Sequence, residues 1–115
     1  MGTLKITPDT APATPYLPPA DRILSGVPQQ SIVDAYGSDD GKFSAGLWAS
    51  TPGRWRVAYT EHEFCHLLEG EVVLHGDDGT VAPYRAGDSF VVPAGFTGTW
   101  EVVTAARKLY AIYQP

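Results

Sequence analysis

The sequence predicts an all-β fold, a small sandwich or barrel of short antiparallel strands. Apolar and polar residues alternate with a period of two, most clearly over residues 54–60, where Trp55, Val57 and Tyr59 share one face. Turn-forming residues interrupt the chain at short intervals, and no long stretch sustains a helical period between them. Roughly nine or ten strands at this spacing are typical of a sandwich or small barrel.

The first two strands are separated by clear turn signals. Residues 31–36 form a strand that ends at Gly37, and the Ser-Asp-Asp-Gly sequence at 38–41 forms a turn. Residues 42–50 form the next strand. The Thr-Pro-Gly sequence at 51–53 ends it, because proline cannot donate to the hydrogen-bond ladder.

The second half of the chain continues this pattern. We expect a tight turn at Gly70, since it sits between two apolar strands and glycine adopts positive φ without strain. The Asp78-Gly79 pair is a strong hairpin signal. Pro93 ends a strand and Gly95 lets the chain turn back. The stretches expected to carry these strands are residues 64–70, 71–76, 81–87, 88–95, 99–104 and 108–114.

The composition fits a single small domain and excludes two classes of partner. With 115 residues, the chain is long enough to bury a core of its own. The formal charge is −5 and the 8 Lys and Arg residues are scattered along the chain. We therefore expect no nucleic-acid partner and no docking on an anionic membrane.

The cysteine content and the apolar runs bear on the compartment. Cys65 is the only cysteine, so no intrachain disulfide can form, which fits a reducing cytoplasm. The sequence shows no basic start followed by a leader-like apolar run, and no apolar run near the ~20 residues of a membrane helix. These observations predict a soluble, cytoplasmic protein.

Residues 1–28 differ in composition from the rest and form a Pro-rich N-terminal arm ahead of a barrel at residues 29–115. The arm holds six of the ten prolines, which favour extended chain over a central strand or a helix. It is either a flexible tail or a segment that packs on its own barrel or on a partner's. The apolar pairs at positions 16–17 and 23–24 give it surface to bury.

Residues 46–74 and 84–102 resemble the two motifs of the cupin superfamily, the RmlC-like jelly rolls. They are most similar to its small single-domain group of DUF861 type, which is related to (S)-ureidoglycine aminohydrolase and the ethanolamine-utilisation cupins. The Pro-Ala-Gly-Phe-Thr-Gly-Thr-Trp run at 93–100 is quite specific to that group, whereas the Leu-Leu-Glu-Gly-Glu turn at 67–71 is common to most cupins. The resemblance implies an antiparallel jelly-roll barrel and a homodimer, with the arm able to reach across to the partner.

The resemblance also places the usual cupin metal ligands, and this chain lacks most of them. The His-x-His pair falls on Val57 and Tyr59, the motif glutamate on Glu63 and the downstream histidine on Gly98. Trp100 follows on the same strand face as Gly98 and could take some of the room that a histidine and its metal need.

A second register, counted from the glycine that precedes the motif, moves the histidine pair to Tyr59 and Glu61 and the glutamate to Cys65. All three usual histidines are missing in either register. A tight transition-metal site wants three or more converging imidazole, carboxylate or thiolate groups. We therefore expect no cofactor, and a divalent metal held by Glu63 with Cys65 stays an open alternative.

The histidines that are present, and the single thiol, are expected to play no part in the chemistry. His62, His66 and His75 are expected at the surface or at an interface, although a loop at His62 would let it turn inward. Cys65 has no base aimed at it, because its neighbour His66 points to the opposite strand face. A buried, inert thiol is the expected state of Cys65.

The expected pocket is aromatic, with a carboxylate as its main polar group. Glu63 is the candidate catalytic acid or base, and Tyr59 is the candidate residue to polarise a carbonyl or hold the ligand. The alternative is that aromatic rings simply fill the barrel and that Glu63 pairs with Arg54, Arg56 or a backbone N–H. The residues expected to line the pocket are Trp48, Trp55, Val57, Cys65, Phe96 and Trp100, with either Tyr110 or Tyr113.

Three functional hypotheses remain open on the sequence. The first is an enzyme that transfers protons on a small polar metabolite bearing nitrogen or a carbonyl group, without the usual metal site. The second is a non-catalytic ligand-binding or accessory cupin dimer, and the third is a metal-dependent cupin with atypical ligands. The missing histidines prevent the ureidoglycine aminohydrolase activity from being transferred to this chain, since fold does not determine function.

Overall fold

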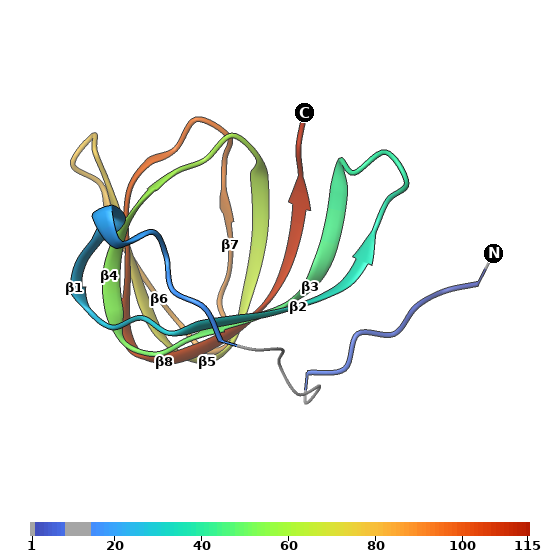
Figure 1. Ribbon diagram of the computed structural model, residues 1–115, viewed down its shortest axis with the longest axis horizontal. Coiled ribbons are helices and arrows are strands. Elements are labelled where there is room, and N and C mark those ends of the chain that lie inside the picture. The colour runs from blue at the N-terminus through green and yellow to red at the C-terminus, as the bar shows by residue number, and fades with distance from the viewer. Residues whose placement is uncertain (1, 9–14) are drawn as a thin grey trace.

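A computed structural model describes residues 2–8 and 15–115 and confirms the all-β prediction (Figure 1). The described residues form eight strands of one antiparallel sheet that curls into a jelly-roll barrel. The strands are β1 Ile23–Gly26, β2 Gln30–Gly37, β3 Phe43–Ser50, β4 Gly53–Ala58, β5 His62–Gly76, β6 Val81–Arg85, β7 Ser89–Val92 and β8 Thr97–Tyr113. A single 3-10 turn, η1 Ala20–Arg22, precedes them. No helix among the described residues is long and apolar enough to cross a membrane.

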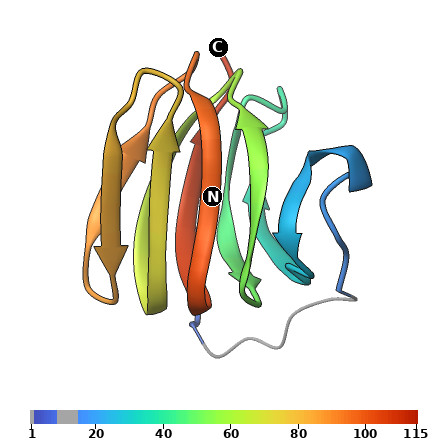
Figure 2. The same cartoon turned by 90° about the vertical axis from the view of Figure 1, so that its left-hand side faces the viewer.

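The sheet is organised around the two longest strands, β5 and β8. The strand order is β1-β4-β8-β3-β2, and β5 pairs with β8 along most of its length and with β6 and β7 on its other side. Figure 2 shows the strands lying side by side along one axis of the molecule. This arrangement directs the alternating apolar residues of β3, β4, β5 and β8 into one common interior.

The tight turn expected at Gly70 is not formed. Gly70 has a φ of 87° but lies within the continuous strand β5, where the pairing with β8 shifts register between Leu67 and Val72. A Cβ at Gly70 would lie 2.3 Å from the carbonyl oxygen of Ala105. Glycine is therefore needed for a bulged bend against β8. We also expected one strand to end at residue 104 and another to begin at residue 108, but β8 is continuous from Thr97 to Tyr113. Each of these two pairs of expected strands is one strand in the structure, so the described residues contain fewer strands than the nine or ten expected.

The other turn predictions are confirmed. The Ser38 amide donates to the Phe43 carbonyl at 2.8 Å and closes the turn between β2 and β3. Gly79, with a φ of 92°, lies in the turn that joins β5 to β6. Strand β7 ends just before Pro93, and Gly95 has a φ of 94° in the turn that leads into β8.

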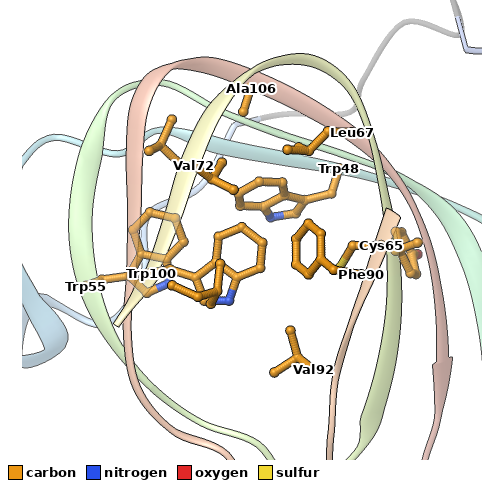
Figure 3. Packing of buried hydrophobic residues seen from close by; sticks show 12 residues of the cluster. Trp48, Trp55, Cys65, Leu67, Val72, Phe90, Val92, Trp100 and Ala106 are labelled. Atoms are coloured by element: carbon orange, nitrogen blue, oxygen red, sulfur yellow. The ribbon is translucent and has the colours of Figure 1, made fainter. Parts of the chain in front are cut away.

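Three tryptophans form the centre of the core (Figure 3). Trp55 of β4 and Trp100 of β8 are directly paired across the sheet, and their rings stack with centroids 6.2 Å apart. Trp48 of β3 tilts against Trp100 with a centroid distance of 5.7 Å. Leu67 and Val72 of β5 are fully buried beside them. The same three rings form part of the wall of a cavity.

Part of the N-terminal arm returns to the barrel. Tyr16 and Gln30 exchange two backbone hydrogen bonds, of 2.8 and 2.7 Å, and β1 pairs with β4 at the edge of the sheet. We call residues 16–22, which connect these two attachments, the strap (Figure 1). Of the six prolines of the arm, Pro12 lies outside the described residues. The domain boundary after residue 28 stays a prediction, although β1 belongs to the sheet.

Candidate functional site

A cavity of about 560 Å³ lies between the strap and the three core tryptophans. Strands β2, β3, β4, β5 and β8 form its walls with inward-pointing side chains, and the strap covers one side of it. Ligand pockets in proteins commonly have volumes of about 300–1,000 Å³ and mostly apolar walls with a few convergent polar groups. The polar groups that reach this cavity decide what it can bind.

A buried chain of polar contacts lies at the floor of the cavity. The Lys108 ammonium contacts Glu63 Oε2 at 3.0 Å, and both side chains are almost fully buried. The Tyr59 hydroxyl donates to Glu63 Oε1 at 2.7 Å and accepts a hydrogen bond from the Trp100 indole at 3.0 Å. Each carboxylate oxygen of Glu63 therefore has a partner, and the carboxylate is held in one orientation.

Lys108 lies among aromatic rings. Its ammonium nitrogen lies 4.5 Å from the ring centroid of Trp48 and 4.3 Å from that of Trp100. Burial is the largest single influence and acts to lower the pKa of Lys108, but the Glu63 carboxylate together with Cys65 outweighs it, so the pKa is raised above its ordinary value. Lys108 therefore stays a charged ammonium, stabilised by one carboxylate and two indole faces.

The two other titratable groups of this region keep their protons. Burial, followed by the charge of Glu63, raises the pKa of Tyr59 well above its ordinary value. Burial also raises the pKa of Cys65 to about 12. Tyr59 is therefore a neutral hydroxyl, and Cys65 is an unreactive thiol at neutral pH. The floor of the cavity carries one positive charge and one negative charge.

The strap adds polar groups on the opposite side of the cavity. Tyr16 lines the cavity together with Gln30, its backbone partner on β2. Burial raises the pKa of Tyr16, and the Trp48 indole and the charges of Lys108 and Glu63 also act on its hydroxyl. The hydroxyl of the arm residue Tyr16 is therefore close to the floor of the cavity.

A sequence model of the EutQ-like cupin domain matches residues 37–110, which span both motifs. The chain belongs to the EutQ-like cupin domain family. This confirms the predicted membership of the cupin superfamily and its DUF861 type. No curated protein matches the sequence of this cupin.

Solved structures agree with this family. A protein of unknown function of the DUF861 family from Pseudomonas syringae pv. tomato is 28% identical with a TM-score of 0.78, over 89% of this chain and 43% of its own. A DUF861 family protein from Thermotoga maritima is 30% identical with a TM-score of 0.54, over 56% of this chain and 73% of its own. A putative ethanolamine utilization protein EutQ from Salmonella typhimurium covers 98% of both chains at 18% identity and a TM-score of 0.68, which shows a shared fold. The cupin thus spans less than half the length of the Pseudomonas protein.

Most of the residues predicted for the pocket lie together at the cavity. Its walls include Tyr59, Glu63, Trp48, Trp55, Val57 and Trp100. Cys65 lies behind the wall, fully buried beside Glu63 and Lys108. Phe96 is not part of the wall, and its ring packs edge-on against Tyr59 with a centroid distance of 6.2 Å.

Of the two tyrosines left open, Tyr110 lines the cavity, and its hydroxyl donates to Asp34 Oδ1 at 2.7 Å. Tyr113 is about half exposed and stacks on His62 outside the cavity. The alternative that Glu63 pairs with an arginine is wrong, because its partner is Lys108 and Arg56 instead binds Asp77.

The sequence reasoning missed Lys108, Tyr16 and Gln30. The signal for Lys108 was present, since it precedes Tyr110 by two residues and β8 therefore directs both side chains inward. Tyr16 and Gln30 carried no such signal, because the fold of the arm decides where they lie. The three histidines bond outside the cavity: His62 to the Ala94 amide, His66 to Ser89 and His75 to Glu101.

The residues at the usual cupin metal position do not fit a divalent metal. No three His, Cys, Asp or Glu side chains converge in residues 2–8 and 15–115. The carboxylate that would bind a metal, Glu63, instead faces the Lys108 ammonium at 3.0 Å. A second cation beside this ammonium would be repelled.

Proposed function

We propose that this cupin binds a small uncharged carbonyl compound, such as an amide, in its aromatic cavity. The observation that carries the proposal is the buried 3.0 Å contact between Lys108 and Glu63. Because the two charges offset each other, a further net charge brought to the floor of the cavity would lose its hydration without gaining an unpaired counter-charge there. A neutral ligand with an oxygen acceptor avoids this cost.

Lys108 is the group that would bind the ligand oxygen. An ammonium has three N–H donors, and only one of them is needed for Glu63. The indole faces of Trp48 and Trp100 keep water away from the ammonium, so a hydrogen bond to it is stronger than in bulk solvent. Trp55 and Val57 supply apolar surface for the hydrocarbon part of the ligand.

The hydrogen bond between Tyr59 and Glu63 favours acid–base catalysis as a second proposal for the same site. Glu63 would accept a proton from the atom next to the ligand carbonyl, and the electron pair would move onto the carbonyl oxygen. Lys108 would stabilise the negative charge that develops there. Tyr59, a neutral donor, holds the carboxylate in place during this transfer.

Binding is tested with two probes of matched shape, butyramide and butyrate. Both are titrated into the protein while the fluorescence of its tryptophans, all three of which line the cavity, is recorded. We expect butyramide to bind about tenfold more tightly than butyrate, because the charged probe loses more hydration energy. Equal or tighter binding of butyrate would overturn the preference for an uncharged ligand.

Catalysis is tested by proton exchange. Small ketones and amides are incubated with the protein in D2O, and deuterium incorporation next to the carbonyl is followed by NMR. We expect Glu63→Gln to slow exchange by at least about 100-fold, since general bases contribute about 10²–10⁴-fold. Exchange that survives this substitution would remove Glu63 as the base, and binding without any exchange would identify a non-catalytic ligand-binding protein.

A further inference from the structure

Gln30 carries a buried donor without an acceptor. Its side chain is 6% exposed, and its Nε2 has no hydrogen-bond partner in the part of the chain that the structure describes. It lies in β2 on the same strand face as Ile32, and both residues line the cavity. An amide nitrogen has two N–H donors, and leaving them unsatisfied in the interior is costly. Native proteins rarely keep such a group without a reason.

Tyr16 presents a second donor at the same end of the cavity. Its side chain lines the cavity together with Trp48, whose indole nitrogen can only donate. A hydroxyl both accepts and donates, so Tyr16 can accept from this indole and still offer its own O–H hydrogen to a ligand.

The backbone holds these two side chains on one face. Tyr16 and Gln30 form an antiparallel bridge with reciprocal backbone hydrogen bonds of 2.8 and 2.7 Å. Directly paired residues of antiparallel strands project to the same side, with Cβ atoms about 5.5 Å apart. The hydroxyl of Tyr16 and the amide of Gln30 can thus converge on one ligand atom.

We propose that Gln30 and Tyr16 form a second polar subsite on the strap side of the cavity, which binds an oxygen acceptor of the ligand other than the one bound by Lys108. The inference rests on the proposed function and adds to it that the ligand carries two carbonyl oxygens. Gln30 Nε2 is itself covered in the structure, so the side-chain amide rotates about its last bond, which has a broad energy profile, to present its N–H groups to the ligand.

The register of the sheet gives the separation between the two subsites. Ile32, Trp48 and Lys108 are paired in one row across β2, β3 and β8, and Gln30 lies two residues along β2 from Ile32. Strand spacing of about 4.8 Å and a rise of about 3.4 Å per residue place the backbones of Gln30 and Lys108 roughly 12 Å apart. Both side chains project from the sheet into the same cavity, so their donors are separated by a similar distance, which a short chain between two carbonyl groups can span.

The test compares glutaramide, which has an amide at each end, with pentanamide, which has the same chain length and one amide. Dissociation constants are measured by tryptophan fluorescence on the full chain. We expect glutaramide to bind about tenfold more tightly, as two additional hydrogen bonds allow. Gln30→Met and Tyr16→Phe should each reduce this advantage several-fold.

Two matched variants control for indirect effects. Gln29→Met changes an exposed neighbour of Gln30, and Tyr36→Phe removes the hydroxyl of an exposed tyrosine outside the cavity. Both should keep the advantage of glutaramide. The melting temperature of Gln30→Met should equal or exceed that of the wild type, because the substitution removes an unsatisfied buried donor. A purely structural role for the amide would lower it.

The outcomes separate the subsite from the proposed function. If pentanamide binds and glutaramide has no advantage, or if Gln30→Met retains that advantage, the second subsite is overturned and the Lys108 site stands. If neither amide binds, the proposed function fails and the subsite fails with it.

Discussion

Gly98 lies so close to the backbone of His75 that a side chain has no room between them. A Cβ at position 98 would lie 2.0 Å from the His75 carbonyl oxygen. Gly98 is the position at which the cupin resemblance places a metal-binding histidine. The histidine is therefore not simply exchanged for a smaller residue, because the backbone of β5 occupies the space that its Cβ would need.

This contact predicts that Gly98→Ala destabilises the fold. The added Cβ must push β5 and β8 apart where Gly76 and Gly98 pair, and overpacking of this kind costs about 1–3 kcal/mol. Urea unfolding measures the loss. Gly37→Ala, at a strand glycine that has no positive φ and nothing within 4 Å of its Cβ position, reports the cost of an alanine without a clash. An unchanged midpoint for Gly98→Ala would show that the strands separate freely.

The Lys108–Glu63 pair predicts an asymmetry between single and double substitutions. Lys108→Met leaves a buried carboxylate unpaired and should destabilise the protein by about 3–5 kcal/mol. Adding Glu63→Gln removes that charge and should restore most of the loss, while the amide oxygen of the new side chain can still accept from Tyr59. The free energy of unfolding is measured for the wild type, both single variants and the double variant, which together form a double-mutant cycle. Additive losses would contradict direct pairing.

The raised pKa of Cys65 predicts that the folded protein loses stability at alkaline pH. Burial raises its pKa from 9.0 to about 12, so the folded state keeps a proton that the unfolded state releases. Stability conferred by this difference is complete below pH 9 and falls as the pH rises toward 12, by up to about 1.4 kcal/mol per pH unit. Urea unfolding between about pH 8 and pH 10 measures the slope. Cys65→Ala should flatten it, and an equal slope in that variant would assign the effect to another group.

The outer face of β5 and β7 predicts a homodimer. Phe64 and Val91 are directly paired across these strands and are 47% and 60% exposed. Large contiguous apolar patches commonly mark protein interfaces, and a dimer formed through this face would bury the pair. Light scattering at micromolar concentration should give the mass of a dimer, and Val91→Lys should give a monomer with an unchanged fold. A monomeric wild type would remove this prediction.

The barrel and part of the candidate site can be predicted from the sequence, because alternation along a strand determines which side chains point inward. Alternation along β4 and the residue that follows it places Trp55, Val57 and Tyr59 inward, and family resemblance locates Glu63. Alternation along β8 likewise points Lys108 inward, but a lysine is expected at the surface unless a buried partner for it is known. Its carboxylate lies on β5, more than forty positions away in sequence, and only the pairing of β5 with β8 joins them.

Other features depend on long-range packing that no local pattern encodes. Gly70 carries the positive φ expected of a turn, yet the neighbouring backbone at Ala105 makes it a bend within a continuous strand. Tyr16 reaches the cavity because its backbone pairs with that of Gln30, and no pattern in the sequence of the proline-rich arm predicts this contact.

The central claim is that the Lys108 ammonium, rather than a metal, is the cation that receives the ligand oxygen. Butyramide is titrated into protein dialysed against a chelator, with and without added divalent metal, and into the Lys108→Met/Glu63→Gln double variant. The account predicts an affinity that chelation does not change and that the double variant lowers by about tenfold or more, as expected for losing a hydrogen bond to a charged donor. Binding that chelation abolishes and metal restores, or that survives in the double variant, would contradict it.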